Sequence, residues 1–131
     1  MCPIAPQYFE NDLIYIIAQA IQFQREGRAP AVIAVDGMAG SGKTTLTERM
    51  VQRLDAAVIH MDDFFLPQGF RTPERLWEPG GNVYYERFME EVLPYLRCGA
   101  PFAYRVFDAH AHRYTETRLV EAKPFIIVEG S

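Results

Sequence analysis

Eight consecutive residues in the first third of the chain combine glycines, a lysine and a threonine in a spacing that suits phosphate binding. Residues 37–44 read Gly-Met-Ala-Gly-Ser-Gly-Lys-Thr and match the pattern G-x-x-x-x-G-K-[ST]. Glycines let the backbone curl so that several N–H groups point at one anion. Lys43 would reach the outer phosphates, and the Thr44 hydroxyl would ligate Mg²⁺. The pattern predicts binding of a nucleoside triphosphate, taken to be ATP with Mg²⁺.

The predicted phosphate contacts come from this loop and the residue after it. They are Gly37, Ala39, Gly40, Ser41, Gly42, Lys43, Thr44 and Thr45. A functional loop of this kind follows a strand and opens a helix. An unbroken apolar run over 31–35 predicts the strand. Residues 44–54 predict the helix, whose start would add the positive end of its dipole to the site. The apolar stripe of this helix is Leu46, Met50 and Leu54.

Three carboxylates follow predicted strands at what should be one edge of a sheet. Residues 56–59 predict a second strand with Asp62 and Asp63 beyond it, and residues 124–128 predict a third, followed by Glu129. Ligands of open α/β sheets bind at the carboxyl ends of the strands. Phosphoryl transfer to a hydroxyl needs a carboxylate that accepts the proton. Because adjacent side chains on an extended backbone point in opposite directions, one aspartate should face the phosphates. Glu129 is expected near Mg²⁺.

Other polar and aromatic side chains leave two interpretations open. Arg71, Arg75 and Arg87 could reach phosphates or belong to a solvated loop and helix face. His110 and His112 have no acid or cysteine at ligand spacing, which disfavours a metal site there. Five aromatic residues could line a pocket for a flat substrate or pack in the core. They are Phe64, Phe65, Trp77, Tyr84 and Tyr85.

The remaining elements complete an alternation of strands and helices. Residues 9–27 predict an N-terminal helix, with Asn11 as its N-cap and Gly27 as its stop. The apolar stripe of this helix is Leu13, Ile16, Ile17, Ala20 and Ile21. The other expected elements are a loop over 64–81, a helix over 86–96 and a hairpin of strands 102–107 and 115–120. This order predicts a parallel sheet, buried on both sides, with helices on both faces.

Length and composition limit the class of protein. A chain of 131 residues fits a single domain. A formal net charge of −4 argues against a sequence-independent hold on nucleic acid, which needs a basic face. The apolar run 13–21 is too short to cross a bilayer and has no basic residues before it, so no membrane association is expected. Cys2 and Cys98 are expected to be free thiols in a reducing cytoplasm.

Five segments together resemble the uridine kinase family of P-loop kinases, which groups with phosphoribulokinase and bacterial pantothenate kinase. The segments are D-G-M-A-G-S-G-K-T-T at 36–45, M-D-D-F-F at 61–65, G-G-N-V-Y-Y-E-R-F at 80–88, F-D-A-H-A-H at 107–112 and I-V-E-G at 127–130. The likeness runs from about residue 31 to the end and keeps the order of the family. It implies an α/β fold, the P-loop NTPase three-layer sandwich with a parallel sheet and an inserted β-hairpin.

The resemblance also implies roles for single residues. Asp62 would be the catalytic base at the acceptor hydroxyl, acting with Lys43, and Glu129 would help Thr44 to hold Mg²⁺. Phe65 would stand against the substrate. The remaining expected substrate contacts are Asp63, Tyr84, Phe107, Asp108 and His112. The resemblance therefore implies ATP-dependent phosphoryl transfer to a hydroxyl of a small molecule.

The acceptor is left open at this point. A nucleoside is the first candidate, although residues 83–85 lack the ribose-binding Asp that uridine kinases usually carry. Pantothenate or a sugar phosphate is an alternative, and so is a nucleotide-binding module without turnover. Members of the family continue beyond the third core strand into an arginine-bearing lid. We therefore expect residues 1–131 to be a truncated domain with a core over 31–131. By itself it should bind nucleotide weakly, transfer phosphoryl groups negligibly and self-associate as a homo-oligomer.

Overall fold

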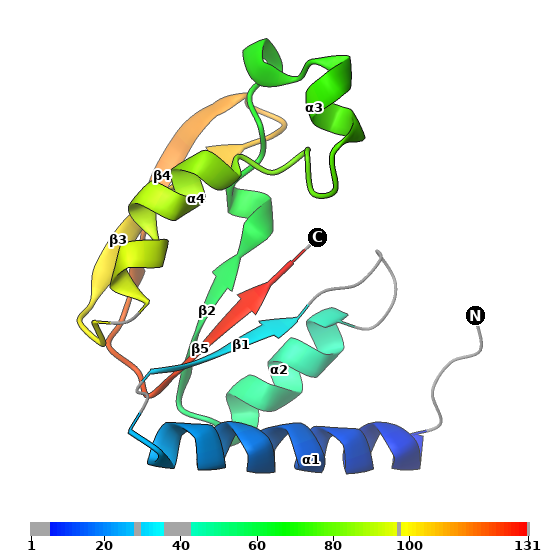
Figure 1. The fold of residues 1–131 in the computed structure, drawn as a ribbon, viewed down its shortest axis with the longest axis vertical. Helices are drawn as coiled ribbons and strands as arrows, with labels where there is room; N and C mark the ends of the chain where they lie inside the picture. Colours follow the sequence, from blue (N-terminus) through cyan, green and yellow to red (C-terminus); the bar gives the residue numbers. More distant parts are fainter. Residues whose placement is uncertain (1–5, 28–29, 36–42, 97, 131) are drawn as a thin grey trace.

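A three-stranded parallel sheet forms the centre of the fold (Figure 1). The structure is a computed structural model and describes residues 6–27, 30–35, 43–96 and 98–130. The strands are β1 Ala31–Val35, β2 Ala56–His60 and β5 Phe125–Glu129. Their order is β1-β5-β2, and β5 pairs in parallel with both neighbours. The predicted parallel arrangement is confirmed, with each strand within one residue of its expected bounds.

Two helices, α1 Pro6–Arg25 and α2 Lys43–Arg53, cover one face of this sheet. Leu13 of α1 and Met50 of α2 are fully buried there. The prediction of Asn11 as N-cap is wrong, because α1 already begins at Pro6, whose fixed φ suits the first turn of a helix. The chain leaves α1 through Gly27 with φ 85°, as expected for a helix stop.

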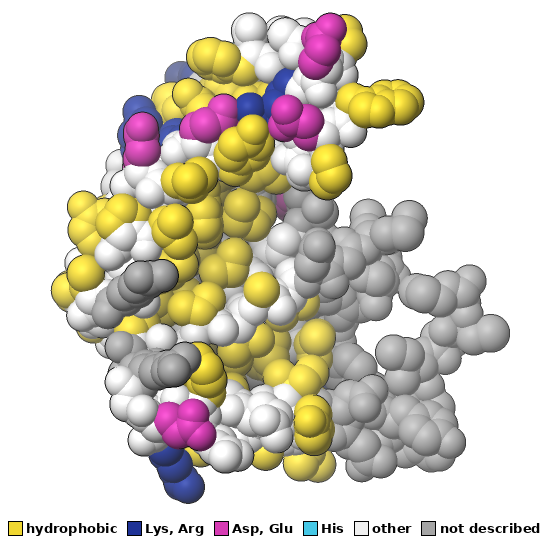
Figure 2. Space-filling view, in the orientation of Figure 1, with side chains coloured by type: hydrophobic (Ala, Val, Ile, Leu, Met, Phe, Trp, Pro, Cys, Tyr) yellow, Lys and Arg dark blue, Asp and Glu magenta, His cyan; other side chains and the backbone are white. Residues whose placement is uncertain are grey.

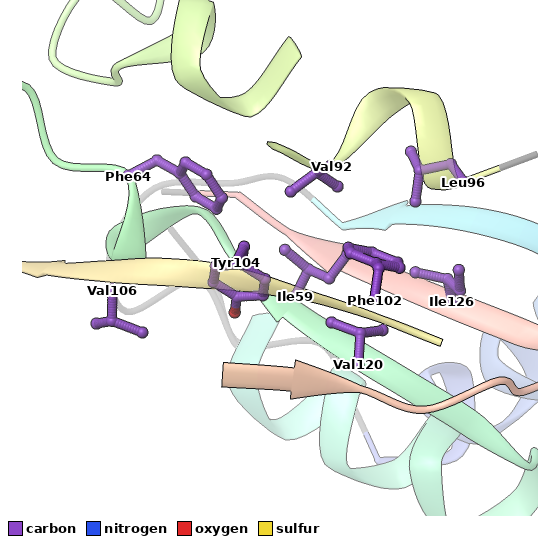
Figure 3. Close-up of a cluster of buried hydrophobic side chains, with 9 residues drawn as sticks. All are labelled: Ile59, Phe64, Val92, Leu96, Phe102, Tyr104, Val106, Val120 and Ile126. Carbon is purple, nitrogen blue, oxygen red and sulfur yellow. The ribbon is translucent and has the colours of Figure 1, made fainter. Parts of the chain in front are cut away.

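The opposite face carries a hairpin and a short helical segment. The hairpin is β3 Phe102–Asp108 and β4 Arg113–Val120, and the helical segment is α4 Tyr85–Glu91 with the 3-10 turn η3 Leu93–Tyr95. The expected helix over 86–96 is interrupted because Pro94 cannot donate a backbone hydrogen bond. Figure 3 shows the core between these elements and the sheet. Its buried residues are Ile59, Phe64, Val92, Leu96, Phe102, Tyr104, Val106, Val120 and Ile126.

The prediction that every strand is buried on both faces is wrong for β1. Val32 has 42% of its surface exposed, and Ala34 is exposed as well. β1 pairs only with β5 among the described residues, and the central sheet contributes residues of β2 and β5, not of β1, to the core under the hairpin. Hydrophobic side chains consequently reach the surface in the region of Figure 2 where β1 runs.

The expected loop over 64–81 is a folded excursion, which we call the arm (residues 66–82). It contains the 3-10 turn η2 Gln68–Phe70 and the helix α3 Pro73–Trp77, seen at the top of Figure 1. The side chain of Thr72 caps α3 by accepting a hydrogen bond from the Arg75 N–H at 3.1 Å. The first and last residues of the arm meet, because the Leu66 N–H donates to the Asn82 carbonyl at 3.0 Å.

The return of the arm toward α4 is possible only with glycine. A Cβ placed on Gly81 would lie 1.8 Å from the Arg75 carbonyl oxygen, which belongs to the backbone of α3. Gly80 has φ 68°, a left-handed conformation that side chains disfavour. The two glycines therefore fix α3 against the start of α4.

The expectations about membrane-spanning helices and about the cysteines can be compared with the described residues. No described helix has both the length and the hydropathy needed to cross a bilayer. Cys98 is exposed and free, as expected. Cys2 lies outside the described residues.

Candidate functional site

The carboxyl ends of all three strands of the central sheet meet at one edge. Val35 and His60 are the register partners of Glu129 on its two sides. The Gly130 N–H donates to the Val35 carbonyl at 2.6 Å and extends this row. The predicted convergence of the strand ends is therefore confirmed for the described residues.

The predicted phosphate loop connects this edge to α2. Its first residues, Gly37, Ala39, Gly40, Ser41 and Gly42, lie outside the described residues, as do the side chains of Lys43 and Thr44. The structure does describe the backbone of α2 from its first residue, Lys43, so the expected strand before this segment and the expected helix after it are confirmed. Thr45 is exposed in the first turn of this helix.

Glu129 is held by a histidine at the end of the neighbouring strand. Its Oε2 lies 3.0 Å from Nδ1 of His60, and its side chain is 10% exposed. Because the two residues are register partners, their side chains lie on the same face of the sheet, the one that α2 covers. Nothing in the sequence pattern pointed to His60, although its position after a buried strand matches that of Glu129.

The donor set at this edge fits Mg²⁺ that arrives with a nucleotide. Glu129 offers a carboxylate oxygen, the kind of ligand that Mg²⁺ prefers. Within the described ranges no group of three or more His, Cys, Asp or Glu side chains could hold a metal by itself. Mg²⁺ commonly binds through one or two carboxylates together with substrate phosphates, so a single protein carboxylate is sufficient.

The two aspartates after β2 have different surroundings. They lie in the 3-10 turn η1 Met61–Asp63, so the extended backbone assumed for them is wrong. Asp62 is exposed. Asp63 turns inward: its Oδ2 accepts a hydrogen bond from the Tyr104 hydroxyl at 2.7 Å and lies 3.4 Å from Arg118. Burial, together with this hydrogen bond, raises the pKa of Tyr104 far above its usual value.

Arg87 joins the aspartate turn to α4 and β3. Only 3% of its surface is exposed, so its interpretation as a solvated helix residue is wrong. Its Nη2 donates to the Asp63 carbonyl at 2.7 Å, and its Nη1 donates to the Arg105 carbonyl at 2.6 Å and to Glu91 at 3.1 Å. The guanidinium also lies 4.1 Å from the ring centroid of Phe64. Arg87 therefore positions the backbone of η1.

Arg75 also makes its contacts with other residues of the fold. Its guanidinium forms a two-point contact with Glu86, at 2.6 and 2.7 Å, and donates to the carbonyls of Gly81 and Val83. The hydrogen bond from Arg75 lowers the pKa of Glu86. These contacts join α3 to α4 and give Arg75 a structural role.

The hairpin turn contributes residues that contact the arm. His112 has φ 54°, and its Nε2 accepts a hydrogen bond from the Gln68 N–H at 3.0 Å. Its ring packs edge-on against Phe107, which is buried. Asp108 accepts backbone N–H bonds within the turn, and the bonds from Ala111 and His110 lower its pKa. The structure thus brings His112, Phe107 and the arm together.

Phe65 and Tyr84 lie where the arm leaves and rejoins the core. Phe65 forms an antiparallel bridge with Val83, and the Tyr84 N–H donates to the Phe64 carbonyl at 2.7 Å. The Tyr84 ring packs against Phe70 with centroids 5.5 Å apart. Both expected substrate contacts are half-buried, so each has one part packed and another part open to a ligand.

Comparison with known proteins identifies the fold. No family model and no curated protein sequence matches the chain. Among solved structures, a protein described as a possible uridine kinase from Bacillus stearothermophilus aligns with a TM-score of 0.69 and 20% identity, over 92% of this chain and 70% of its own. A candidate fructose transport system kinase from Silicibacter sp. TM1040 aligns at 0.66 and 24% identity, over 91% and 63%.

A third structure, D-glycerate 3-kinase from Cryptococcus neoformans, aligns with a TM-score of 0.65 and 16% identity, over 96% of this chain and 53% of its own. The chain thus spans between 53% and 70% of the length of these three proteins. At these identities the likeness is one of fold. The chain has the α/β fold of P-loop kinases, with a parallel sheet and an inserted hairpin.

Proposed function

We propose that this chain binds ATP with Mg²⁺ and serves phosphoryl transfer to a hydroxyl group of a small molecule. The observation that carries the proposal is the shared edge of the sheet. There the end of β5 brings Glu129, and the end of β2 brings Asp62, to the side where the glycine-rich segment leads into α2. Three solved proteins of similar fold are named as kinases, which supports the same chemistry.

In the proposed mechanism the loop residues from Gly37 to Thr45 bind the phosphates through backbone N–H groups, and Lys43 contacts the outer two. Thr44 and Glu129 would hold Mg²⁺, which neutralises charge on the phosphates when bound. The acceptor oxygen attacks the γ-phosphorus while the bond to the β–γ bridging oxygen breaks and ADP leaves. Asp62 accepts the hydroxyl proton. Its exposed side chain is free to meet a substrate, whereas Asp63 is engaged with Tyr104.

The acceptor would lie against the aromatic residues at the base of the arm. Phe65 and Tyr84 are half-buried there, and His112 reaches the arm from the hairpin turn. A nucleoside is the acceptor that the motif resemblance favours, and pantothenate or a sugar phosphate is the alternative. We place the protein in the cytoplasm, where ATP and such acceptors occur.

The first experiment tests nucleotide binding. Lys43→Ala should weaken ATP–Mg²⁺ binding more than tenfold in titration calorimetry, because a charge-assisted contact contributes about 1.5–3 kcal/mol. Lys123→Ala is the matched control, because Lys123 pairs with Asp55 and makes no predicted phosphate contact. Equal ATP affinity of wild type and Lys43→Ala would exclude the proposed phosphate loop.

The second experiment tests transfer in a protein that includes any lid beyond residue 131. Asp62→Asn should keep ATP affinity and lower turnover by about 10²–10⁴, the usual contribution of a general base. Asp63→Asn should lower turnover much less. ADP release without dependence on Asp62, measured over a panel of alcohols, would contradict the proposed base. ATP binding without any acceptor-dependent ADP release would favour a nucleotide-binding module.

A further inference from the structure

Arg71, in the arm, has a guanidinium that the fold leaves incompletely satisfied. Its central carbon lies 4.6 Å from the ring centroid of Phe65. Its Nη1 is buried and, within the described part of the chain, has no hydrogen-bond partner. The residue as a whole is half-buried.

Four other arginines each contact a carboxylate, although the buried Nε of Arg87 also has no hydrogen-bond partner among the described residues. The carboxylate contacts are Arg75–Glu86 at 2.6 Å, Arg87–Glu91 and Arg105–Glu91 at 3.1 Å, and Arg118–Glu116 at 2.9 Å. No acidic side chain among the described residues lies within 4 Å of the Arg71 guanidinium. A buried charged donor without an acceptor is costly, so an acceptor supplied by a ligand would relieve a penalty already present in the free protein.

The position of Arg71 points to the acceptor of the proposed reaction. Phe65, the ring under its guanidinium, directly follows the buried Phe64 and lies three residues after Asp62. Phe65 also pairs with Val83 at the base of the arm, beside Tyr84. An acceptor with its hydroxyl at Asp62 that extends over the Phe65 ring would therefore approach Arg71.

We propose that Arg71 binds an anionic group of the acceptor, a carboxylate or a phosphate, while Asp62 meets its hydroxyl. This inference rests on the proposed function, because it takes the acceptor to lie beside Phe65. The planar fork of arginine matches both anions with two parallel hydrogen bonds. The inference narrows the acceptor to hydroxy acids and sugar phosphates, and it disfavours neutral nucleosides.

Matched pairs of ligands test the charge requirement directly. We would titrate the protein, with ADP–Mg²⁺ at saturation, with pantothenate and neutral panthenol, glycerate and glycerol, and fructose 6-phosphate and fructose. In at least one pair the anionic member should bind at least tenfold more tightly. The variant Arg71→Met should lower the affinity for that anion about tenfold to hundredfold and leave the affinity for its neutral partner unchanged.

Methionine keeps the contact with the Phe65 ring while removing the unpaired donor, so Arg71→Met should unfold at the same temperature as wild type or higher. Arg25→Met, at the exposed end of α1, is the control for a loss of charge. A preference for neutral ligands in every pair, absence of binding by any anionic member, or an anion preference that survives in Arg71→Met would overturn the inference. An equal loss of affinity for both members of a pair in Arg71→Met would also overturn the inference, because it would indicate that Arg71 acts through packing.

The two proposals fail in different ways. Absence of ATP–Mg²⁺ binding by the wild type, with an Arg71-dependent anion preference retained, would reject the proposed function and keep the anion site. Weaker ATP–Mg²⁺ binding in Arg71→Met, with unchanged acceptor affinity, would assign Arg71 to the nucleotide and reject the anion site on the acceptor.

Discussion

At the scale of single residues, Asp62 and Asp63 are adjacent in sequence but have different surroundings. Asp62 is exposed, whereas Asp63 accepts a hydrogen bond from buried Tyr104 and lies beside Arg118. The short turn η1 produces this difference, because a 3-10 turn rotates consecutive side chains by about 120°. One aspartate is therefore available for chemistry while the other fixes the turn.

This difference predicts unequal effects of two conservative substitutions on stability. Asp63→Asn should lower the free energy of unfolding by about 1–3 kcal/mol, because it removes the charge that Tyr104 and Arg118 contact. Asp62→Asn should change it by less than about 0.5 kcal/mol, as is usual for exposed positions. Urea denaturation of the two variants and the wild type measures both values. A larger loss in Asp62→Asn would contradict the assignment.

The contacts of Glu91 predict how part of the folding stability changes at acidic pH. Burial acts to raise its pKa, but hydrogen bonds from Arg105 and the charge of Arg87 outweigh burial and lower it. A carboxyl whose pKa is depressed in the folded state stabilises the fold above its unfolded pKa, about 4.3. That stabilisation is lost as the pH falls below about 4.3 and through the folded pKa. In thermal unfolding at several pH values, Glu91→Gln should be less stable than wild type at neutral pH, with the gap closing in acid. A stability difference between Glu91→Gln and wild type that does not change with pH would contradict a lowered pKa of Glu91 in the folded state.

At the scale of elements, the contact between η1, α4 and β3 depends on one buried side chain. Arg87→Ala would remove the side-chain donor to the Asp63 and Arg105 carbonyls and one of the two arginines that contact Glu91, and it would open a cavity beside Phe64. We expect a loss of about 3–5 kcal/mol, as for other broken buried ion pairs. Arg105→Ala, which removes a half-exposed partner of the same carboxylate, should cost less than about 1 kcal/mol. Chemical denaturation tests the ranking, and equal losses would show that burial of Arg87 is unimportant.

Also at this scale, the sequence predicts the sheet and α2 well and the arm poorly. The strands are short apolar runs, and the run in β5 is buried as its unbroken apolar pattern predicts. The helix α3 has five residues and little apolar periodicity, so its stability depends on the Thr72 cap and on tertiary contacts of Arg75. Burial of Arg87 could not be predicted either, because it requires acceptors from two other elements.

In the predicted site, too, some features could be predicted from the sequence and others depend on tertiary structure. The approach of Glu129 to the ends of its neighbouring strands followed from strand order, and the structure confirms it. The contact with His60 depends on register between β2 and β5, which no local pattern encodes. The roles of the phosphate loop and of Asp62 remain predictions.

At the scale of the whole molecule, the exposed edge of β1 predicts association between chains. In the described part, β1 has a strand partner on one side only, and a groove of about 400 Å³ lies between it and α1, lined among others by Tyr15, Phe23 and Val32. Free backbone groups beside apolar side chains favour pairing with another strand. Residues 1–131 should therefore self-associate in light scattering. Val32→Lys should reduce association without loss of fold, since Val32 is 42% exposed. A monodisperse monomer of the wild-type chain would contradict the prediction.

The closed base of the arm has a consequence for how such proteins diversify. Because Leu66 and Asn82 are bonded to each other, the arm begins and ends at nearly the same place and is independent of the register of the sheet. The entropy of closing a loop grows only slowly with its length, so a longer arm would by itself cost little chain entropy. A new ligand preference could arise in the arm while the edge of the sheet that carries Glu129 keeps its sequence.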